Sequence, residues 1–323
     1  MINFIMNNGL DIPAIGYGVF MMSSVEIEQH LPEAIETGYR HIDTANAYFN
    51  EVAVGKVIKE SGIAREDFFI TSKLFPQSYE YEQCKKDIDA TLERMQLDYL
   101  DLMLFHQPYG EYVSGWKAME EAVQEGKVKS IGLSNFPMHK IQEILDVATI
   151  KPAVLQVEIN PYWNQHELKE QLKAQNITFE GWYPLGHGDA NLLNEPVFAK
   201  LAKKYGKTTA QIIMRWHLQE GNVIFPKTLN PQHMADNLDI FDFELTDEEM
   251  AAINSLPQKA YYVVSKEAPA FVLNHNDYSK QAYQLIERRN TVMEYVTLNN
   301  GVKMPMLGYG VFQNTSRGNR ALR

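Results

Sequence analysis

The sequence is poor in cysteine, in net positive charge and in long hydrophobic runs, and each shortage excludes a class of protein. Cys84 is the one cysteine, so the chain can form neither an internal disulfide nor a zinc site built from several cysteines. The 30 Lys and Arg residues are outnumbered by 41 Asp and Glu, which gives a formal net charge of -11. That charge argues against nucleic-acid binding, which relies on Lys and Arg to neutralise phosphates. No apolar run is long enough to span a bilayer, so we expect no membrane partner.

Two further features are missing. The nine histidines include no His-Glu-x-x-His pair, so a metal site has little support. Residues 1–8 lack the basic region and the uninterrupted apolar region of a signal peptide. With a single cysteine, which suits a reducing compartment, the sequence predicts a cytoplasmic protein.

What is present is a repeated alternation of strand and helix patterns. The chain has 323 residues, 45% of them hydrophobic, which is enough for a full core and typical of an α/β barrel in one domain. About eight strand–helix units follow one another, which predicts an α/β fold, a closed (β/α)8 TIM barrel. The Asn-Gly turn at residues 8–9 predicts an N-terminal β-hairpin that closes the barrel bottom. The strands are expected at 16–18, 42, 68–71, 100–105, 128–133, 154–159, 177–182 and 223–225, and helices at 26–37, 51–61, 80–95, 115–124, 138–147 and 166–174.

The C-terminal part of the chain repeats its beginning. The Asn-Asn-Gly of residues 7–9 returns at 299–301, and Gly-Tyr-Gly-Val-Phe of 16–20 returns at 308–312. We therefore expect a barrel over 1–290, a truncated repeat of the hairpin segment over 293–312 and an unstructured tail over 313–323. The repeat contains no counterpart of the polar strand-end residues described next, so it cannot form a second active site.

Four ionisable or hydrogen-bonding residues follow three successive apolar runs: Asp43, Tyr48, Lys73 and His106. In a parallel barrel the strand ends meet at one rim, where the chemistry of such barrels lies. There a tyrosine can protonate the alkoxide that forms when a carbonyl is reduced. Lys73 would lower the pKa of the tyrosine, Asp43 would hold the lysine charged and oriented, and His106 would bind the substrate oxygen.

Each of these residues also has a structural interpretation when taken alone. Tyr48 could be a packing residue, Asp43 and Lys73 an ordinary ion pair, and His106 a core histidine with its hydrogen bonds satisfied. Their joint spacing at three adjacent strand ends favours the catalytic interpretation.

Around these residues the chain resembles the aldo-keto reductase superfamily, including its bacterial 2,5-diketo-gluconate reductase and prostaglandin F synthase-like members. The motifs run in order from the hairpin to about Leu256. They are GYRHIDTA at 38–45 with Tyr48, Ser72-Lys73, His106 with Pro108, GLSNF at 132–136, QVEINP at 156–161, and Pro226-Lys227-Thr228 with Asn237. The resemblance implies an NADPH-dependent enzyme that reduces aldehydes and ketones, acting as a monomer or weak homo-oligomer.

The resemblance also assigns cofactor-binding positions. Ser134, Asn135 and Gln156 would bind the nicotinamide carboxamide. Trp182, in the segment that contains Leu185, would stack on the ring, although it could instead fill the core. The positions on the adenosine side are Lys227, Thr228, His233, Asp236 and Asn237, of which Asp236 could equally cap the last barrel helix.

The adenosine positions leave the choice of cofactor open. Lys227 favours NADPH, whereas His233 stands where the family commonly has arginine, and histidine lacks the permanent charge and planar fork of arginine. NADH use is therefore possible.

For a small carbonyl substrate, we expect an apolar pocket formed by Phe20, Phe75, Tyr109 and the aromatic stretch 260–278, which contains Tyr261, Tyr262 and Phe271. These hydrophobic residues could instead simply pack against one another. A rival function from another class is a cofactor-sensing regulatory barrel with little turnover, like the β subunits of potassium channels. The sequence does not name the substrate.

Overall fold

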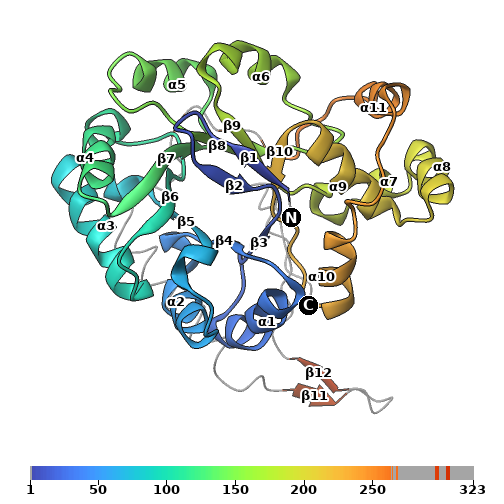
Figure 1. Cartoon of the computed structure of the whole chain (residues 1–323), viewed down its shortest axis with the longest axis horizontal. Helices are drawn as coiled ribbons and strands as arrows, with labels where there is room; N and C mark the ends of the chain where they lie inside the picture. Colours follow the sequence, from blue (N-terminus) through green and yellow to red (C-terminus); the bar gives the residue numbers. More distant parts are fainter. Residues whose placement is uncertain (1, 263, 265–266, 268–294, 298–302, 306–323) are drawn as a thin grey trace, which may run out of the picture.

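A closed barrel of parallel strands organises the molecule (Figure 1). The computed structural model describes residues 2–262, 264, 267, 295–297 and 303–305. Within them, one sheet runs in the order β10-β9-β8-β7-β6-β5-β4-β3, and a parallel bridge between Ile15 and Ile224 joins its two edges. This confirms the predicted barrel. Its strands are β3 (Gly16–Gly18), β4 (His41–Asp43), β5 (Phe69–Leu74), β6 (Leu100–Phe105), β7 (Val128–Ser134), β8 (Val154–Glu158), β9 (Thr178–Trp182) and β10 (Asn222–Ile224).

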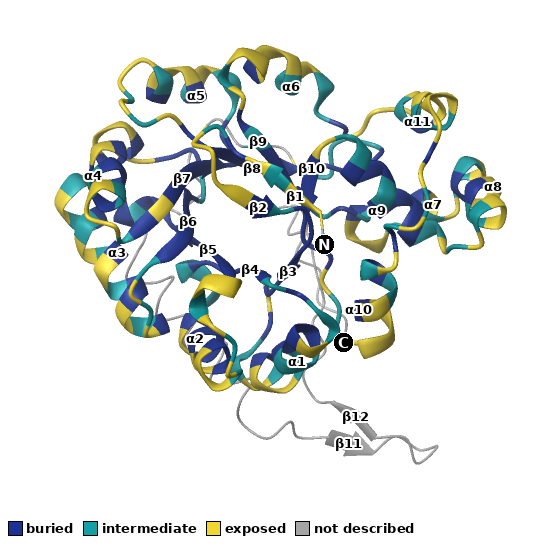
Figure 2. Ribbon diagram, in the orientation of Figure 1, coloured by how far each residue is buried: buried dark blue, intermediate teal, exposed yellow. Residues whose placement is uncertain are grey.

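Helices surround the barrel, and their burial follows their sequence pattern. Figure 2 shows buried strands inside a ring of helices whose outer faces are exposed. In α1, a capping box between Ser23 and Glu26 starts the helix, and Gly38 ends it in a left-handed conformation. The helices are α1 (Ser24–Thr37), α2 (Glu51–Glu60), α3 (Tyr81–Met95), α4 (Tyr112–Gln124), α5 (Met138–Leu145), α6 (His166–Leu172), α7 (Ala190–Leu193), α8 (Pro196–Tyr205), α9 (Thr209–Gln219), α10 (Pro231–Leu238) and α11 (Asp247–Asn254).

An antiparallel hairpin of β1 (Asn3–Ile5) and β2 (Asp11–Pro13) lies across the ring of strands, as predicted (Figure 1). Met6 and Ile12 are buried against inward-facing barrel residues such as Leu102 and Val223. Asn7 also donates a hydrogen bond to the carbonyl of Pro152, at 2.8 Å. The hairpin therefore closes the end of the barrel opposite the strand C-termini.

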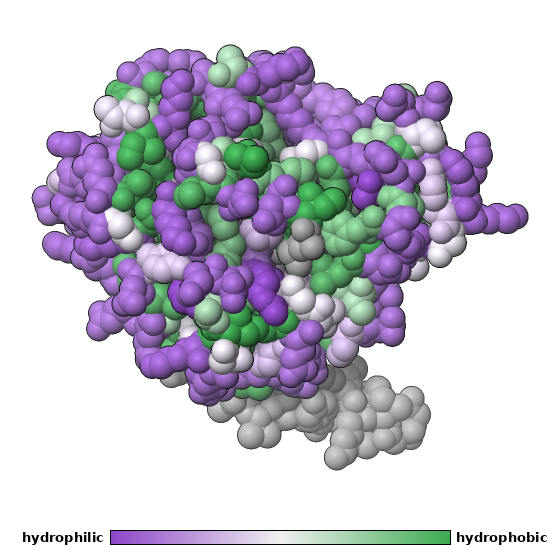
Figure 3. Space-filling model, in the orientation of Figure 1, coloured by the Kyte–Doolittle hydropathy of each residue, from purple (hydrophilic) through white to green (hydrophobic). Residues whose placement is uncertain are grey.

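Polar and apolar side chains are distributed unevenly over the viewed surface of the described residues. Figure 3 shows hydrophilic side chains over the outer helices, with hydrophobic ones gathered towards the middle of the viewed face. Among the described residues, no helix combines the length and the apolar character needed to cross a membrane.

Some boundaries differ from the sequence-based expectations. β5 continues beyond Thr71, because its pairing with β6 extends to Lys73↔Leu104 and Leu74↔Phe105. Lys73 therefore lies inside a strand instead of after it. Helix α4 begins at Tyr112 and not at residue 115, and α7 to α11 were not among the predicted helices.

Two short strands near the C-terminus pair in the way that β1 and β2 do. β11 (Tyr295–Thr297) and β12 (Lys303–Pro305) are antiparallel, with Tyr295 opposite Pro305, as Asn3 is opposite Pro13. Most of the predicted repeat at 293–312, the tail at 313–323 and Phe271 lie outside the described residues. The division of the chain at residues 290 and 313 stays a prediction.

Candidate active site

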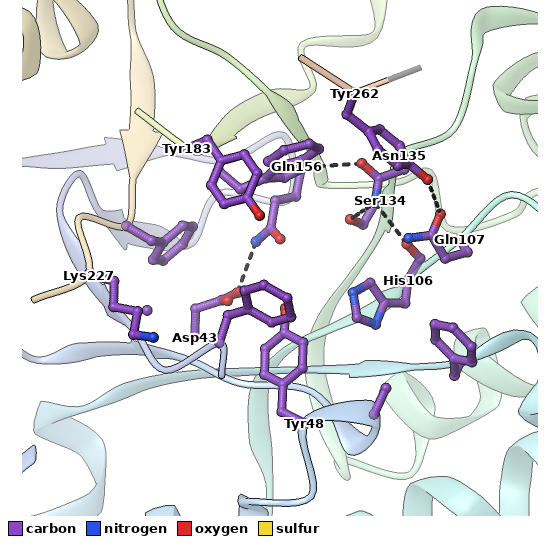
Figure 4. A pocket seen from close by; sticks show the side chains of 16 residues that line it. Asp43, Tyr48, His106, Gln107, Ser134, Asn135, Gln156, Tyr183, Lys227 and Tyr262 are labelled. Atoms are coloured by element: carbon purple, nitrogen blue, oxygen red, sulfur yellow. Dashed lines mark hydrogen bonds between the residues drawn. The ribbon is translucent and has the colours of Figure 1, made fainter. Parts of the chain in front are cut away.

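A cavity of about 340 Å³ opens at the C-terminal ends of the barrel strands (Figure 4). This volume is at the lower end of the range for small-molecule sites. Both aromatic rings and polar groups line it, and eleven of the sixteen lining residues are predicted site residues. The lining comprises Gly18, Phe20, Asp43, Ala47, Tyr48, Phe75, His106, Gln107, Ser134, Asn135, Gln156, Trp182, Tyr183, Phe225, Lys227 and Tyr262.

Lys73 lies fully buried beneath the cavity, with 0% of its surface exposed. Its ammonium donates hydrogen bonds to Asp43 Oδ1 at 2.6 Å and to the Thr44 carbonyl at 2.9 Å. Its Nζ is 3.4 Å from the Tyr48 hydroxyl. Burial lowers the pKa of Lys73, but Asp43, Tyr48 and Glu180 together more than offset this, so the net pKa is raised and the lysine stays charged.

The Tyr48 hydroxyl is held in its protonated form. Burial raises the pKa of Tyr48 to about 12, although Lys73 opposes the shift. Lys73 lowers this pKa, as expected, but desolvation of the phenolate outweighs the attraction of the ammonium, so the net pKa moves away from neutrality. The phenol consequently keeps its proton at neutral pH, which is the state a proton donor needs.

His106 faces Tyr48 across the cavity floor, and the two ring centroids are 5.6 Å apart. Burial, followed by the charge of Lys73, lowers the pKa of His106 well below its usual value. The imidazole is therefore neutral and carries a single N–H donor. Its Nδ1 has no hydrogen-bond partner among the described residues.

Gln156 bridges two carboxyl groups with one amide nitrogen. Its Nε2 donates to Asp43 Oδ2 at 2.9 Å and to Glu180 Oε2 at 2.8 Å. With both N–H groups occupied, the amide oxygen is the group left to accept a hydrogen bond from a ligand. Figure 4 shows the nitrogen directed at Asp43 and the oxygen turned the other way.

Asn135 and Trp182 are linked on the other wall. Trp182 Nε1 donates to Asn135 Oδ1 at 3.0 Å, while Asn135 Nδ2 donates to the His106 carbonyl at 3.1 Å. Asn135 adopts a left-handed backbone conformation, with φ of 65°, which asparagine tolerates better than most residues. The GLSNF motif thus ends β7 with its polar side chains at the cavity.

Besides Lys73 and Tyr261, six predicted site residues lie outside the cavity lining. Tyr109 packs against Phe75 instead. Leu185 follows β9, Thr228 comes shortly before α10, and the remaining three belong to that helix. Those three are His233, which is exposed, Asp236, whose Oδ1 accepts a hydrogen bond from Gln232, and Asn237, which is buried.

Several cavity residues were not predicted individually. Gln107 directly follows His106, so the reasoning that selected the histidine could have included it. Tyr183 directly follows Trp182 and enters the cavity from a residue with φ of 52°. Tyr262, in contrast, is a predicted residue of the aromatic stretch, and its ring lies 5.6 Å from that of Trp182. Gly18, Ala47 and Phe225 complete the lining without a sequence signal of their own.

Comparison with known proteins adds an independent finding. Residues 14–258 match the Aldo/keto reductase family. The chain belongs to this family. The glyoxal reductase of Bacillus subtilis (strain 168) is 45% identical to this aldo/keto reductase over 253 residues, which cover 78% of this chain and 91% of that protein. The methylglyoxal reductase DkgA of Escherichia coli (strain K12) is 39% identical over 256 residues, with 78% and 92% covered.

Solved structures agree with this assignment. The crystal structure of a Bombyx mori aldo-keto reductase in complex with NADP has a TM-score of 0.74 and 34% identity, and the match covers 78% of this chain and 91% of that one. The family membership, the TIM-barrel fold and the enzyme class, an oxidoreductase, are thereby confirmed for this aldo/keto reductase.

Proposed function

We propose that this aldo/keto reductase reduces small aldehydes and 2-oxoaldehydes to alcohols with NADPH. The observation that carries the proposal is the placement of a protonated Tyr48 between the charged Lys73 and the neutral His106. The names of the two relatives, a glyoxal reductase and a methylglyoxal reductase, support this substrate class.

The polar groups of the cavity fit a nicotinamide cofactor. The free oxygen of Gln156 suits the N–H of a carboxamide, and Ser134 and Asn135 offer further polar groups beside it. Trp182 and Tyr183 supply aromatic surface for a flat ring. Lys227, an exposed cation at the cavity, suits a phosphate. When bound there, NADPH supplies the hydride that carbonyl reduction requires.

The catalytic residues have separate tasks in this proposal. His106 donates its one N–H to the substrate oxygen and orients the carbonyl. Tyr48 then gives its proton to the same oxygen as negative charge develops there. Lys73 stabilises the phenolate that remains, and Asp43 keeps Lys73 in place.

Substrate size is limited by the cavity walls. Phe20 lies against Tyr48, with ring centroids 5.0 Å apart, and Phe75 lies against His106 at 5.5 Å. Gln107 places one polar amide beside these rings, where Tyr262 donates a hydrogen bond to it at 3.3 Å. A short dicarbonyl fits such a site, because one oxygen reaches Tyr48 and the other can meet a polar group.

The test is NADPH oxidation in the presence of glyoxal, methylglyoxal and a set of simple aldehydes. We expect turnover with the dicarbonyls, and we expect it to be lost when Tyr48 is replaced. Tight NADPH binding without turnover of any carbonyl would contradict the proposal and favour the regulatory barrel.

Cofactor preference gives a separate prediction for Lys227. Lys227→Ala should raise the Kd for NADPH about tenfold and change that for NADH less than about twofold, because a charged hydrogen bond to the 2′-phosphate is worth about 1.4 kcal/mol or more. Fluorescence titration with both cofactors measures this. His233→Ala serves as the comparison, and we expect it to change the NADPH-to-NADH ratio less. Equal wild-type Kd values for the two cofactors would refute the NADPH preference.

A further inference from the structure

A buried acid lies beneath the cavity floor, and the proposed reaction does not use it directly. Glu180 is the central residue of β9, and none of its surface is exposed. Its Oε2 accepts the hydrogen bond from Gln156, but its Oε1 has no hydrogen-bond partner among the described residues. A fully buried carboxylate with one oxygen unpaired is costly, whereas a carboxylic acid in the same place is much less so.

The surroundings of Glu180 do not supply a second cation. The titratable groups that face it are Asp43 and His41 from β4 and Lys73 from β5. Neighbouring β8 contributes the uncharged Gln156, and β10 contributes Val223, which is opposite Glu180 in the strand register.

His41 cannot act as the missing cation. Burial lowers its pKa to about 3, and its Nε2 lies within 3.0 Å of Thr71 Oγ1 but 4.0 Å from Glu180 Oε1. Lys73 is therefore the one charged cation that faces the two carboxyl groups among the described residues. An ionised Glu180 would leave this cluster with a net charge of about minus one.

We propose that Glu180 is a positioning residue of the reductase site that holds a proton at neutral pH, so that Asp43 is the sole anion competing for Lys73. The inference rests on the proposed function, because its catalytic meaning depends on Tyr48 as the proton donor. The chain of contacts runs from Glu180 through the Gln156 amide to Asp43, and from Asp43 through Lys73 to Tyr48.

The electrostatics of the site agree with this role. Burial, and then the negative charge of Asp43, raises the pKa of Glu180 to about 8. When Glu180 loses its proton above that pH, its negative charge partly neutralises the field of Lys73. Lys73 then stabilises the Tyr48 phenolate less, so the phenolate is harder to form. Proton donation by Tyr48 is then slower, so reduction weakens as the pH rises through 8.

Glu180→Gln tests the proposal, because glutamine has the same shape, still accepts from Gln156 and carries no charge at any pH. We expect wild-type kcat/KM for methylglyoxal to fall about three- to tenfold between pH 7 and pH 9 through this group. The fall should be absent in Glu180→Gln. A variant with the wild-type pH profile would overturn the proposal.

Two measurements do not depend on turnover. The infrared C=O stretch of a protonated carboxylic acid should be present in the wild type at pH 6, disappear by pH 9 and be missing from Glu180→Gln. Glu51→Gln is the matched control, since burial also raises the pKa of Glu51, but this carboxyl pairs with Arg94 and does not line the cavity. The band should persist in that control. If wild type lacks the band at pH 6, or if Glu180→Gln keeps it, the proposal is wrong even if the enzyme reduces carbonyls.

The second measurement is the pH dependence of the free energy of unfolding. The pKa of Glu180 in the folded protein, about 8, exceeds the ordinary glutamate value of 4.5, so the folded state holds a proton that the unfolded state loses between those pH values. The contribution of this group to stability is therefore present below pH 4.5 and lost as the pH rises through 8. Urea unfolding should show the wild type losing stability relative to Glu180→Gln between pH 5 and pH 8. A constant difference between the two proteins would contradict the proposal.

Discussion

We expect Tyr48→Phe to lower kcat for carbonyl reduction by about 10³-fold and to change the Kd for NADPH less than about twofold. General acid catalysis contributes factors of this size, and phenylalanine removes the hydroxyl without removing the ring. The ring matters because Phe20 packs against it, with centroids 5.0 Å apart. Stopped-flow measurement of NADPH oxidation, together with a fluorescence titration of the cofactor, separates chemistry from binding.

The pH dependence and a matched control complete this experiment. Since the pKa of Tyr48 is about 12, its protonation state does not change between pH 6 and pH 8, and reduction should not respond to this group there. Tyr112→Phe is the control, because the Tyr112 hydroxyl donates to Glu143 of α5 and Tyr112 does not line the cavity. A Tyr48→Phe enzyme that retained a tenth of wild-type kcat would remove Tyr48 from the role of proton donor.

The second large effect concerns Lys73→Met. This change leaves the nearly buried Asp43 carboxylate without its cation, and breaking a buried pair in this way costs about 3–5 kcal/mol of folding free energy. It also removes the positive charge that stabilises the Tyr48 phenolate, so we expect kcat to fall by at least about 10²-fold. Urea unfolding and steady-state kinetics at pH 7 measure the two losses.

A double variant distinguishes stability from catalysis. Asp43→Asn combined with Lys73→Met removes both charges, so most of the lost folding free energy should return. Activity should not return, because the ammonium is still missing. Recovery of activity in the double variant would show that Lys73 acts only through the integrity of the fold.

The sequence predicted the barrel and the meeting of four distant residues for a physical reason. Strands of a parallel barrel end at the same rim, so polar residues near three consecutive strand ends are brought together. The structure places Lys73 2.6 Å from Asp43 and 3.4 Å from Tyr48, and His106 faces Tyr48. The roles of these residues stay proposals until variants are measured.

Other features could not be predicted from the same pattern. Both faces of a barrel strand are buried, so an alternation of polar and apolar residues does not show which side chains point into the barrel and which face the helices. The sequence of the strand Thr178–Trp182 therefore does not predict that Glu180 lies near Asp43. The pKa of Tyr48 depends on competition between burial and Lys73, which requires coordinates. Lys73 was assigned to a strand end because the apolar run stops at Thr71, whereas strand pairing continues to Leu74.

The complete burial of Lys73 has a further consequence if dicarbonyls are the substrates. Glyoxal and methylglyoxal are glycating agents that condense with accessible amines. The catalytic amine lies below the cavity floor and is fully hydrogen-bonded, so a dissolved aldehyde does not reach it while the protein is folded. Lys227, by contrast, is exposed at the cavity, so a dissolved aldehyde can reach it. Glycation by the enzyme's own substrates would therefore first weaken cofactor binding through Lys227 and leave proton donation by Tyr48 intact.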